Sequence, residues 1–186
     1  MDRREAIQRT TLLIGTALTP GLATAILGGC TPKIELGWSP RFLSEEEAAI
    51  TGQIADRIIP KTETPGALDV GVDQYIDGML LDVYSEEDGN SFKEGIGKIN
   101  KYSKEEFGNN FLKLEPEEVD SMLKKFESEK ERVFQICKEL TLIGYFTSEQ
   151  GIKSNFEYRP IPGSYEPCLD YNSGDKVWIG NHVSNN

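Results

Sequence analysis

The chain has 186 residues, in which 31 acidic side chains outnumber 20 basic ones and give a formal net charge of −11 at pH 7. A surface this acidic argues against binding to nucleic acid and against electrostatic adsorption to anionic lipid. The length suits one domain with a modest hydrophobic core.

The first 29 residues have the three parts of a bacterial secretory signal, namely a basic start, an apolar stretch and small residues at its end. The apolar stretch covers about residues 12–27, and Pro20 and Gly21 interrupt it. It is also short and weakly apolar for a bilayer-spanning helix, which needs about 20 strongly apolar residues. We therefore expect a signal peptide over residues 1–29.

The apolar stretch ends in Leu27-Gly28-Gly29-Cys30, which resembles a bacterial lipobox. Small residues let the peptide bond before Cys30 enter a protease, and a lipid transferase alkylates the cysteine thiol. We therefore expect an exported lipoprotein that begins at a lipidated Cys30 and faces the periplasm from one of the two membranes. A membrane-facing helix with a chance cysteine at its end is the alternative.

Arg3 and Arg4 also resemble the start of a twin-arginine motif, which directs the export of an already folded protein. The pattern lacks the usual aromatic residue after the arginines, and Gln8 stands where lysine is common. Export by the general route, with two arginines adjacent by chance, is the alternative.

Residues 30–43 contain two prolines and a glycine and are expected to form a lipidated tether. Ser44 and Glu47 then form a capping-box pattern, in which the serine caps a free amide and the glutamate reaches back. Isoleucines at four-residue spacing predict a helix that stops at Pro60, and a loop follows over residues 60–71.

Four further helices are predicted from apolar periodicity and from start signals. We expect them at about residues 72–83, from Ser85 to about residue 99, from Glu115 to about residue 126, and at about residues 129–146. The last is the most apolar and is the candidate for the centre of the core; a buried free thiol is the ordinary explanation for its Cys137. The sequence therefore predicts an all-α domain over residues 44–186, with about five helices in a compact bundle and no convincing strand before residue 156.

The character of the chain changes after residue 157. The stretch from Tyr158 to Cys168 holds three prolines and cannot form a regular helix or a central strand. Aromatic residues are nevertheless too frequent for a disordered tail. We expect an irregular C-terminal arm over residues 157–186 that packs on its own helices or on a partner. Export allows a disulfide between Cys137 and Cys168, but nothing in the sequence shows that they meet.

A search for catalytic and metal-binding patterns is mostly negative. The single histidine, His182, lies in a polar tail near the C-terminus, where a catalytic triad or a metal site is implausible. The chain has no haem-attachment motif, no cysteine cluster and no phosphate-binding loop. Asp69, Asp73 and Asp77 fall at four-residue spacing, and we interpret them as a solvated helix face rather than as a metal site or an acid/base pair.

Several stretches together resemble the gluconate 2-dehydrogenase subunit 3 family. The most specific are ADRIIPKTETPGA, from Ala55 to Ala67, and LTLIGYFTSE, from Leu140 to Glu149. The arginines of the signal, Phe42-Leu43-Ser44, Pro160–Tyr165, Cys168 and Gly174–Trp178 follow in the family's order. The resemblance covers nearly all of the chain after Cys30, whereas residues 84–128 match only in general character.

The resemblance implies the small, cofactor-free subunit of a membrane-associated FAD-dependent sugar or sugar-acid dehydrogenase. In such complexes a large FAD-binding flavoprotein oxidises the substrate, and a c-type cytochrome, which contains haem, often takes the electrons. The small subunit escorts the folded flavoprotein through twin-arginine export and stays bound to it. The resemblance therefore implies a non-catalytic accessory subunit, with FAD and haem only in its partners and no metal of its own. A lipobox is not universal in the family, so here the small subunit would also be the membrane anchor.

Contacts with the large subunit are expected from two segments, the loop Thr62–Ala67 and the aromatic stretch Tyr158–Cys168. The candidate contact residues are Thr62, Thr64, Pro65, Gly66, Tyr158, Pro160, Pro162, Tyr165 and Cys168. For the loop, a plain connection between two helices is the alternative.

Two other functions are compatible with the sequence. A stand-alone lipoprotein would bind a ligand or a glycan through aromatic side chains, for which Trp38, Tyr165, Tyr171 and Trp178 are the candidates. An enzyme that uses a pair of carboxylates would turn over substrate as a purified single chain. A large FAD-binding oxidoreductase encoded next to this chain would favour the accessory subunit instead.

Overall fold

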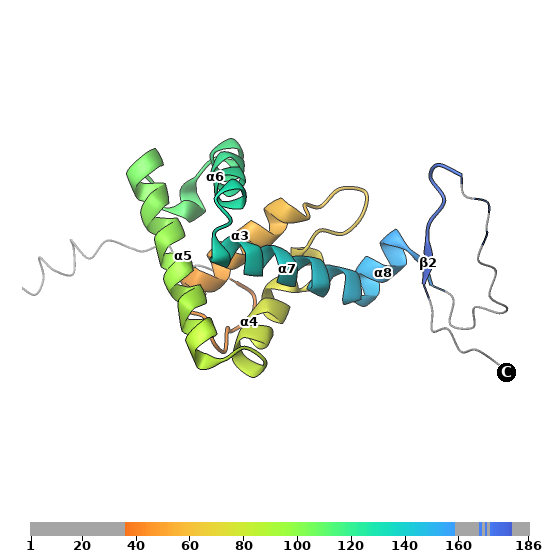
Figure 1. The fold of residues 1–186 in the computed structure, drawn as a ribbon, viewed down its shortest axis with the longest axis horizontal. Coiled ribbons are helices and arrows are strands. Elements are labelled where there is room, and N and C mark those ends of the chain that lie inside the picture. The colour runs from red at the N-terminus through yellow and green to blue at the C-terminus, as the bar shows by residue number, and fades with distance from the viewer. Residues whose placement is uncertain (1–35, 159–167, 169, 171, 180–186) are drawn as a thin grey trace, which may run out of the picture. The chain divides into compact units, whose positions relative to one another are not determined.

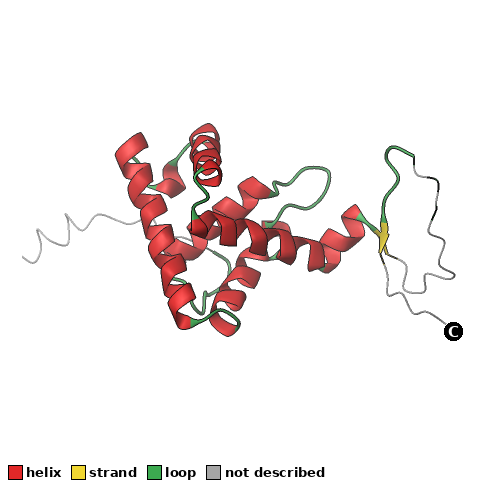
Figure 2. Cartoon of the chain, in the orientation of Figure 1, coloured by secondary structure: helices red, strands yellow, loops and turns green. Residues whose placement is uncertain are grey.

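The computed structural model describes residues 36–158, 168, 170 and 172–179. Within these residues the chain forms six α-helices, two short 3-10 helices and a pair of very short strands (Figures 1 and 2). The predicted all-α bundle is confirmed, with one helix more than the number expected. None of the helices in the described part of the chain is long and apolar enough to cross a membrane.

The helices follow one another with short connections. They are α3 (Glu45–Ile58), η1 (Leu68–Val70), α4 (Val72–Asp82), α5 (Glu86–Phe107), η2 (Phe111–Lys113), α6 (Pro116–Ser128), α7 (Arg132–Thr147) and α8 (Glu149–Asn155). The strands β1 (Glu157–Tyr158) and β2 (Trp178–Ile179) pair in parallel. The sequence did not predict α8, which is only 7 residues long and begins at a serine cap, Ser148.

Local signals set where most of these helices begin. The hydroxyl of Ser44 accepts a hydrogen bond from the Glu47 N–H at 3.2 Å, and the Glu47 carboxylate accepts one from the Ser44 N–H at 2.8 Å. The predicted capping box is thus confirmed. Ser85 caps α5, and Pro116 occupies the first turn of α6 as predicted.

The last long helix begins later than predicted, at Arg132 rather than at about residue 129. The reason is Lys130, whose positive φ of 56° reverses the chain direction between α6 and α7. This left-handed conformation is unfavourable for a side chain other than glycine and cannot continue a helix.

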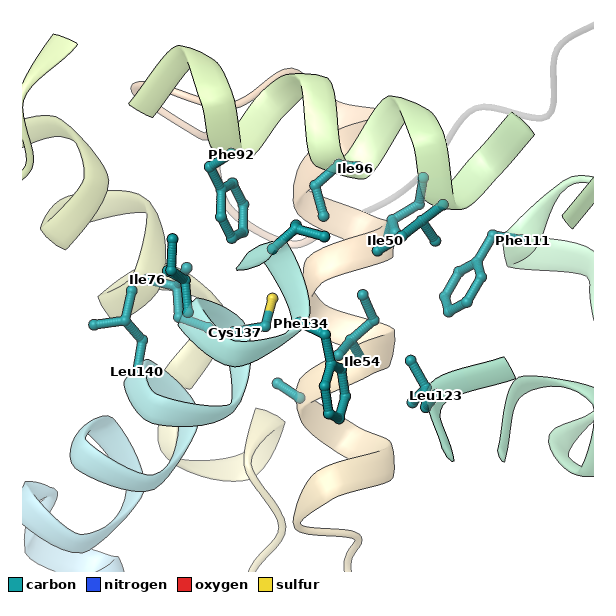
Figure 3. Close-up of a cluster of buried hydrophobic side chains, with 14 of the residues drawn as sticks. Ile50, Ile54, Ile76, Phe92, Ile96, Phe111, Leu123, Phe134, Cys137 and Leu140 are labelled. Carbon is teal, nitrogen blue, oxygen red and sulfur yellow. The ribbon is translucent and has the colours of Figure 1, made fainter. Parts of the chain in front are cut away.

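Helix α7 lies at the centre of the bundle, as its apolar sequence predicts, and contacts α3, α4, α5, α6 and α8. Apolar side chains from these elements meet around it (Figure 3), among them Ile50, Ile54, Ile76, Phe92, Ile96, Phe134, Cys137 and Leu140. Cys137 is a buried free thiol, as expected, and burial raises its pKa to about 12. Cys168 is exposed and also free, so no disulfide joins the two in the described structure.

The interpretation of Asp69, Asp73 and Asp77 as one solvated acidic face is wrong for Asp77, although Asp69 is exposed. The Asp77 side chain is buried, with only 1% of its surface exposed. Its carboxylate accepts hydrogen bonds from three successive backbone N–H groups, those of residues 41, 42 and 43, at 2.8, 3.1 and 2.8 Å. A buried carboxylate is tolerated because such donors replace its hydration.

Asp73, one turn before Asp77, holds a second point of the same N-terminal segment. Its carboxylate accepts a hydrogen bond from the indole N–H of Trp38 at 2.6 Å. The two acids therefore bind the segment that precedes α3 to α4. This segment falls within the expected tether, whose boundaries stay a prediction.

Candidate partner interface

Two segments that are distant in the sequence meet at the hydroxyl of Tyr145, near the end of α7. The Tyr145 side chain is 2% exposed, and its hydroxyl donates a hydrogen bond to the carbonyl oxygen of Pro65 at 2.8 Å. The side-chain amide of Asn155, in α8, donates to the same hydroxyl at 3.1 Å. One buried phenol thus joins the loop after α3, the end of α7 and the end of α8.

The loop between α3 and η1, residues 59–67, is held by its own hydrogen bonds. The Ala67 N–H donates to the Ile59 carbonyl at 2.9 Å and closes the loop at its base. The Thr62 N–H donates to the Thr64 carbonyl at 3.1 Å, and the two hydroxyls lie 3.3 Å apart. Together with the bond from Tyr145, these contacts give the loop a defined structure.

Gly66 is required where this loop passes close to itself. A Cβ atom at Gly66 would lie 2.7 Å from the backbone nitrogen of Lys61, which is closer than any real side chain is found. The carboxylate of Asp69 secures the same crossing, because it accepts a hydrogen bond from the Gly66 N–H and one from the Lys61 ammonium, each at 2.9 Å. These hydrogen bonds hold the pKa of Asp69 below its ordinary value, and the bond from Lys61 has the larger effect.

The candidate contact residues of the loop differ in accessibility. Thr62 is exposed at the tip, Thr64 and Pro65 are half-buried, and Gly66 is buried. Thr62 therefore presents the most accessible of these side chains to a partner, whereas Gly66 shapes the loop from inside.

An exposed apolar face lies on the last two turns of α7, close to Tyr145. It consists of Leu142, Ile143 and Phe146, which are 38, 42 and 40% exposed. Residues three and four apart share one side of a helix, so these side chains lie together. The Phe146 ring also meets the ring of Phe156, which follows α8, with the ring centres 5.8 Å apart. Contiguous apolar surface of this kind is typical of an interaction site.

The sequence did not predict this apolar face, because the apolar pattern of the helix does not show which of its sides the other helices cover. The end of α7 is apolar nearly all round, and α4 decides which side is buried. A Cβ atom at Gly144 would lie 2.6 Å from the ring of Tyr75. The close approach of α4 at Gly144 leaves the other side of the helix uncovered.

Two open grooves lie elsewhere in the described bundle. One, of about 310 Å³, runs between α3, α6 and α7 and contains a bidentate ion pair, in which Arg57 donates to Asp120 at 2.8 and 2.6 Å. This hydrogen bonding lowers the pKa of Asp120 and raises that of Arg57. The other, of about 290 Å³, lies between α5 and the end of α6, where the Lys125 ammonium donates to the Tyr102 hydroxyl at 2.8 Å. In the described part of the chain, no group of three or more His, Cys, Asp or Glu side chains could hold a metal ion.

The remaining candidate residues are only partly covered by the structure. Those outside the described residues are Arg3, Arg4, Cys30, Pro160, Pro162, Tyr165 and Tyr171. Tyr158 and Trp178 lie in the paired strands β1 and β2, and Cys168 is exposed. Trp38, a candidate for glycan binding, is half-buried, and its indole N–H is already bonded to Asp73.

The family model described as gluconate 2-dehydrogenase subunit 3 matches residues 45–163 of the chain. The matched span contains the loop at residues 59–67, the apolar face of α7 and all of α8. Comparisons with curated proteins and with solved structures give no match.

Proposed function

The chain belongs to the gluconate 2-dehydrogenase subunit 3 family, and on this premise we propose that it is a non-catalytic accessory subunit of an exported FAD-dependent dehydrogenase. The large partner would be a flavoprotein of the gluconate or glucose type, which holds the FAD and oxidises the substrate. Any haem would belong to a cytochrome partner. The part of this chain would be to bind the flavoprotein, escort it through export and keep it at the membrane.

The apolar face of α7 is the observation that supports this function best. Three large apolar side chains, Leu142, Ile143 and Phe146, stand exposed on a protein of strongly acidic composition. In the same helix Tyr145 binds the loop at residues 59–67 through the Pro65 carbonyl. A preorganised apolar surface binds a partner with little loss of side-chain and loop entropy. We infer that the flavoprotein docks on this face and on the exposed tip of the loop.

Export and anchoring are assigned to the N-terminal residues. Arg3 and Arg4 would direct a folded, flavin-loaded complex to twin-arginine export, because a folded partner cannot thread a translocon for unfolded chains. Lipid on Cys30 would then retain the complex at the membrane. Bacterial lipoproteins combine two or three acyl chains, and more than one chain is needed for stable anchoring.

Replacement of Arg3 and Arg4 by lysine tests the escort role. The double variant is expected to leave both this chain and its flavoprotein in the cytoplasm, whereas Cys30→Ser is expected to release an exported complex from the membrane. Both are measured by fractionation of the cells and by assay of flavin in each fraction. Unchanged export of the flavoprotein in the arginine variant would contradict the escort role.

A further inference from the structure

Helix α8 is bound closely to the end of α7 at both of its ends. At its start, the Ser148 hydroxyl donates a hydrogen bond to the Tyr145 carbonyl at 2.7 Å and accepts one from the Gly151 N–H at 3.0 Å. At its end, the side-chain amide of Asn155 donates to the Gly151 carbonyl at 2.8 Å and to the Tyr145 hydroxyl at 3.1 Å. Tyr145, Ser148, Gly151 and Asn155 are here called the α7–α8 corner.

The corner requires glycine at position 151. A Cβ atom there would lie 2.0 Å from the carbonyl oxygen of Tyr145 and 2.8 Å from the Ser148 hydroxyl. Because the carbonyl belongs to the backbone of α7, any side chain at position 151 would force α8 away from α7. Tyr145 and Ser148 lie in the stretch Leu140–Glu149, whose sequence is one of the two most specific in the chain. The corner is a structural reason for that stretch which the apolar face of α7 does not supply.

The corner also holds the base of the C-terminal arm, because β1 follows α8 and contacts it. The Glu157 N–H donates to the Val177 carbonyl at 3.1 Å, and the Lys176 ammonium donates to the Ser154 carbonyl at 2.7 Å. Both sides of the strand pair are therefore attached to the end of α8. Each strand is 2 residues long, and a two-stranded pair of this size has little stability of its own in water. The position of the pair therefore depends on the helix that carries it.

Apolar side chains lie on both sides of the corner. On one side is the exposed face of α7, whose Phe146 ring meets the ring of Phe156 with the ring centres 5.8 Å apart. Phe156 is half-buried and directly precedes β1. On the other side is Val177, which directly precedes β2 and is 60% exposed. The corner therefore sets how the apolar face and the strand pair are arranged relative to each other.

We propose that the α7–α8 corner sets the geometry of a two-part docking surface, in which the flavoprotein contacts the apolar face of α7 and the strand pair together. This inference rests on the proposed function, which names the flavoprotein as the partner of that face. A rigid corner lets both parts bind without the entropy cost of ordering the arm. The four residues of the corner are positioning residues, because they act on the partner through the placement of α8.

Removal of the Ser148 hydroxyl tests the proposal on the full chain, isolated with its flavoprotein from membranes of the native host. Ser148→Ala loses the cap of α8 and the bond to Tyr145, whereas Ser148→Thr keeps a hydroxyl. Ser85→Ala is the matched control, because Ser85 caps α5 through the Asp88 N–H at 3.1 Å, outside the corner. The flavin retained per chain after washing is expected to fall roughly two- to fivefold in Ser148→Ala, since a lost cap shifts a local equilibrium by about this factor. Retention should stay at the wild-type level in the other two variants.

Gly151→Ala is the stronger variant of the same test and should lower the retention of flavin further. Its matched control is Gly95→Ala in α5, where the added Cβ would lie 2.5 Å from Val133. This control introduces a comparable clash away from the corner, so it separates loss of stability from loss of positioning. It should retain the flavoprotein wherever it folds.

Hydrogen exchange measures the contact at the strand pair directly. In the wild-type chain, the amides of β1 and β2 should exchange several-fold more slowly in the complex than in the free chain, because the flavoprotein covers them. Unchanged exchange would overturn the proposal. So would full retention of flavin by Ser148→Ala, or an equal loss in Ser85→Ala.

These contradicting results would leave docking on α7 untouched, since Ile143→Asp tests that face separately. A wild-type chain isolated without any flavoprotein would instead contradict the proposed function, and this inference with it.

Discussion

The hydroxyl of Tyr145 donates a hydrogen bond to the carbonyl oxygen of Pro65 across 2.8 Å, although the two residues are 80 positions apart in the sequence. This bond joins the loop at residues 59–67 to the end of α7. The loop is thereby fixed to the helix that carries the exposed apolar face.

Tyr145→Phe is expected to lower the free energy of unfolding by about 1 to 2 kcal/mol, because it leaves the Pro65 carbonyl and the Asn155 amide without this partner. Chemical denaturation measures the loss, and hydrogen exchange should be faster at the Thr62 amide. Tyr102→Phe is the matched control, because its hydroxyl meets Lys125 at the surface; its effect should stay within about 0.5 kcal/mol. Equal losses in the two variants would show that the hydrogen bond to Pro65 stabilises the fold no more than a surface hydrogen bond does.

Thr141→Val is expected to stabilise the fold by about 1 kcal/mol. Thr141 is fully buried in α7, and its hydroxyl finds no hydrogen-bond partner among the described residues, so its burial carries an uncompensated cost. Valine has nearly the same shape without the hydroxyl.

Thr51→Val is the control for this substitution. Thr51 is equally buried, but its hydroxyl donates to the Glu47 carbonyl at 2.8 Å, so valine should give no gain there. Thermal unfolding of both variants measures the change in stability. A loss of stability in Thr141→Val would show that the Thr141 hydroxyl has a hydrogen-bond partner in the folded protein.

Gly144→Ala is expected to destabilise the fold by about 1 to 3 kcal/mol, because the added Cβ would meet the Tyr75 ring at 2.6 Å where α4 and α7 cross. Gly97→Ala, in α5, should instead raise stability by about 0.5 to 1 kcal/mol, since nothing lies within 4 Å of its added Cβ. Denaturant titration of the two variants measures the free energy of unfolding, which should fall for Gly144→Ala and rise for Gly97→Ala. A neutral Gly144→Ala would mean that the two helices are not in close contact there.

Asp120→Asn is expected to change how stability depends on pH. The hydrogen bond from Arg57 lowers the pKa of Asp120 in the folded state, so between the lowered value and about pH 4 the unfolded chain binds more protons. The stabilisation from the pair is therefore complete above about pH 4 and is lost as the pH falls through the lowered pKa. The pair is partly exposed, with 31 and 39% of its side chains accessible, so the loss at pH 7 should be about 0.5 to 1 kcal/mol.

Urea unfolding of the wild-type chain and of Asp120→Asn, repeated from neutral to acid pH, measures the difference between their free energies of unfolding. This difference should shrink toward zero as the pH falls below about 4. A difference that stays constant over the whole range would show that the carboxylate charge of Asp120 is not what stabilises the fold.

The elements that the sequence predicts well are those whose signals are local. Ser44 and Ser85 cap amides within three residues of themselves. Pro116 marks the start of α6 because proline favours the first turn of a helix. The central place of α7 also follows from its composition alone. Helix α8 has only a serine cap and too few residues for an apolar period, so the sequence does not predict it.

The features that the sequence does not predict depend on distant contacts. Asp77 is buried because amides more than 30 residues upstream bind it, and Tyr145 finds its partner 80 residues away. The spacing of Asp73 and Asp77 within α4 does not show that the segment before α3 binds both of them. Likewise, nothing in the sequence of α7 shows that α4 covers Gly144 and leaves Phe146 exposed.

Co-purification of a flavoprotein with this chain is the most direct test of the central claim. The full chain is isolated with a C-terminal tag from membranes of the native host, as wild type, as Ile143→Asp in the apolar face, and as Val83→Asp. Val83 is 65% exposed at the end of α4 and serves as the matched control outside the face. We predict that the wild type and Val83→Asp retain a large flavin-containing subunit in equal amounts and that Ile143→Asp loses most of it. Recovery of the wild-type chain without any flavoprotein would contradict the accessory role, and full retention by Ile143→Asp would contradict the interface.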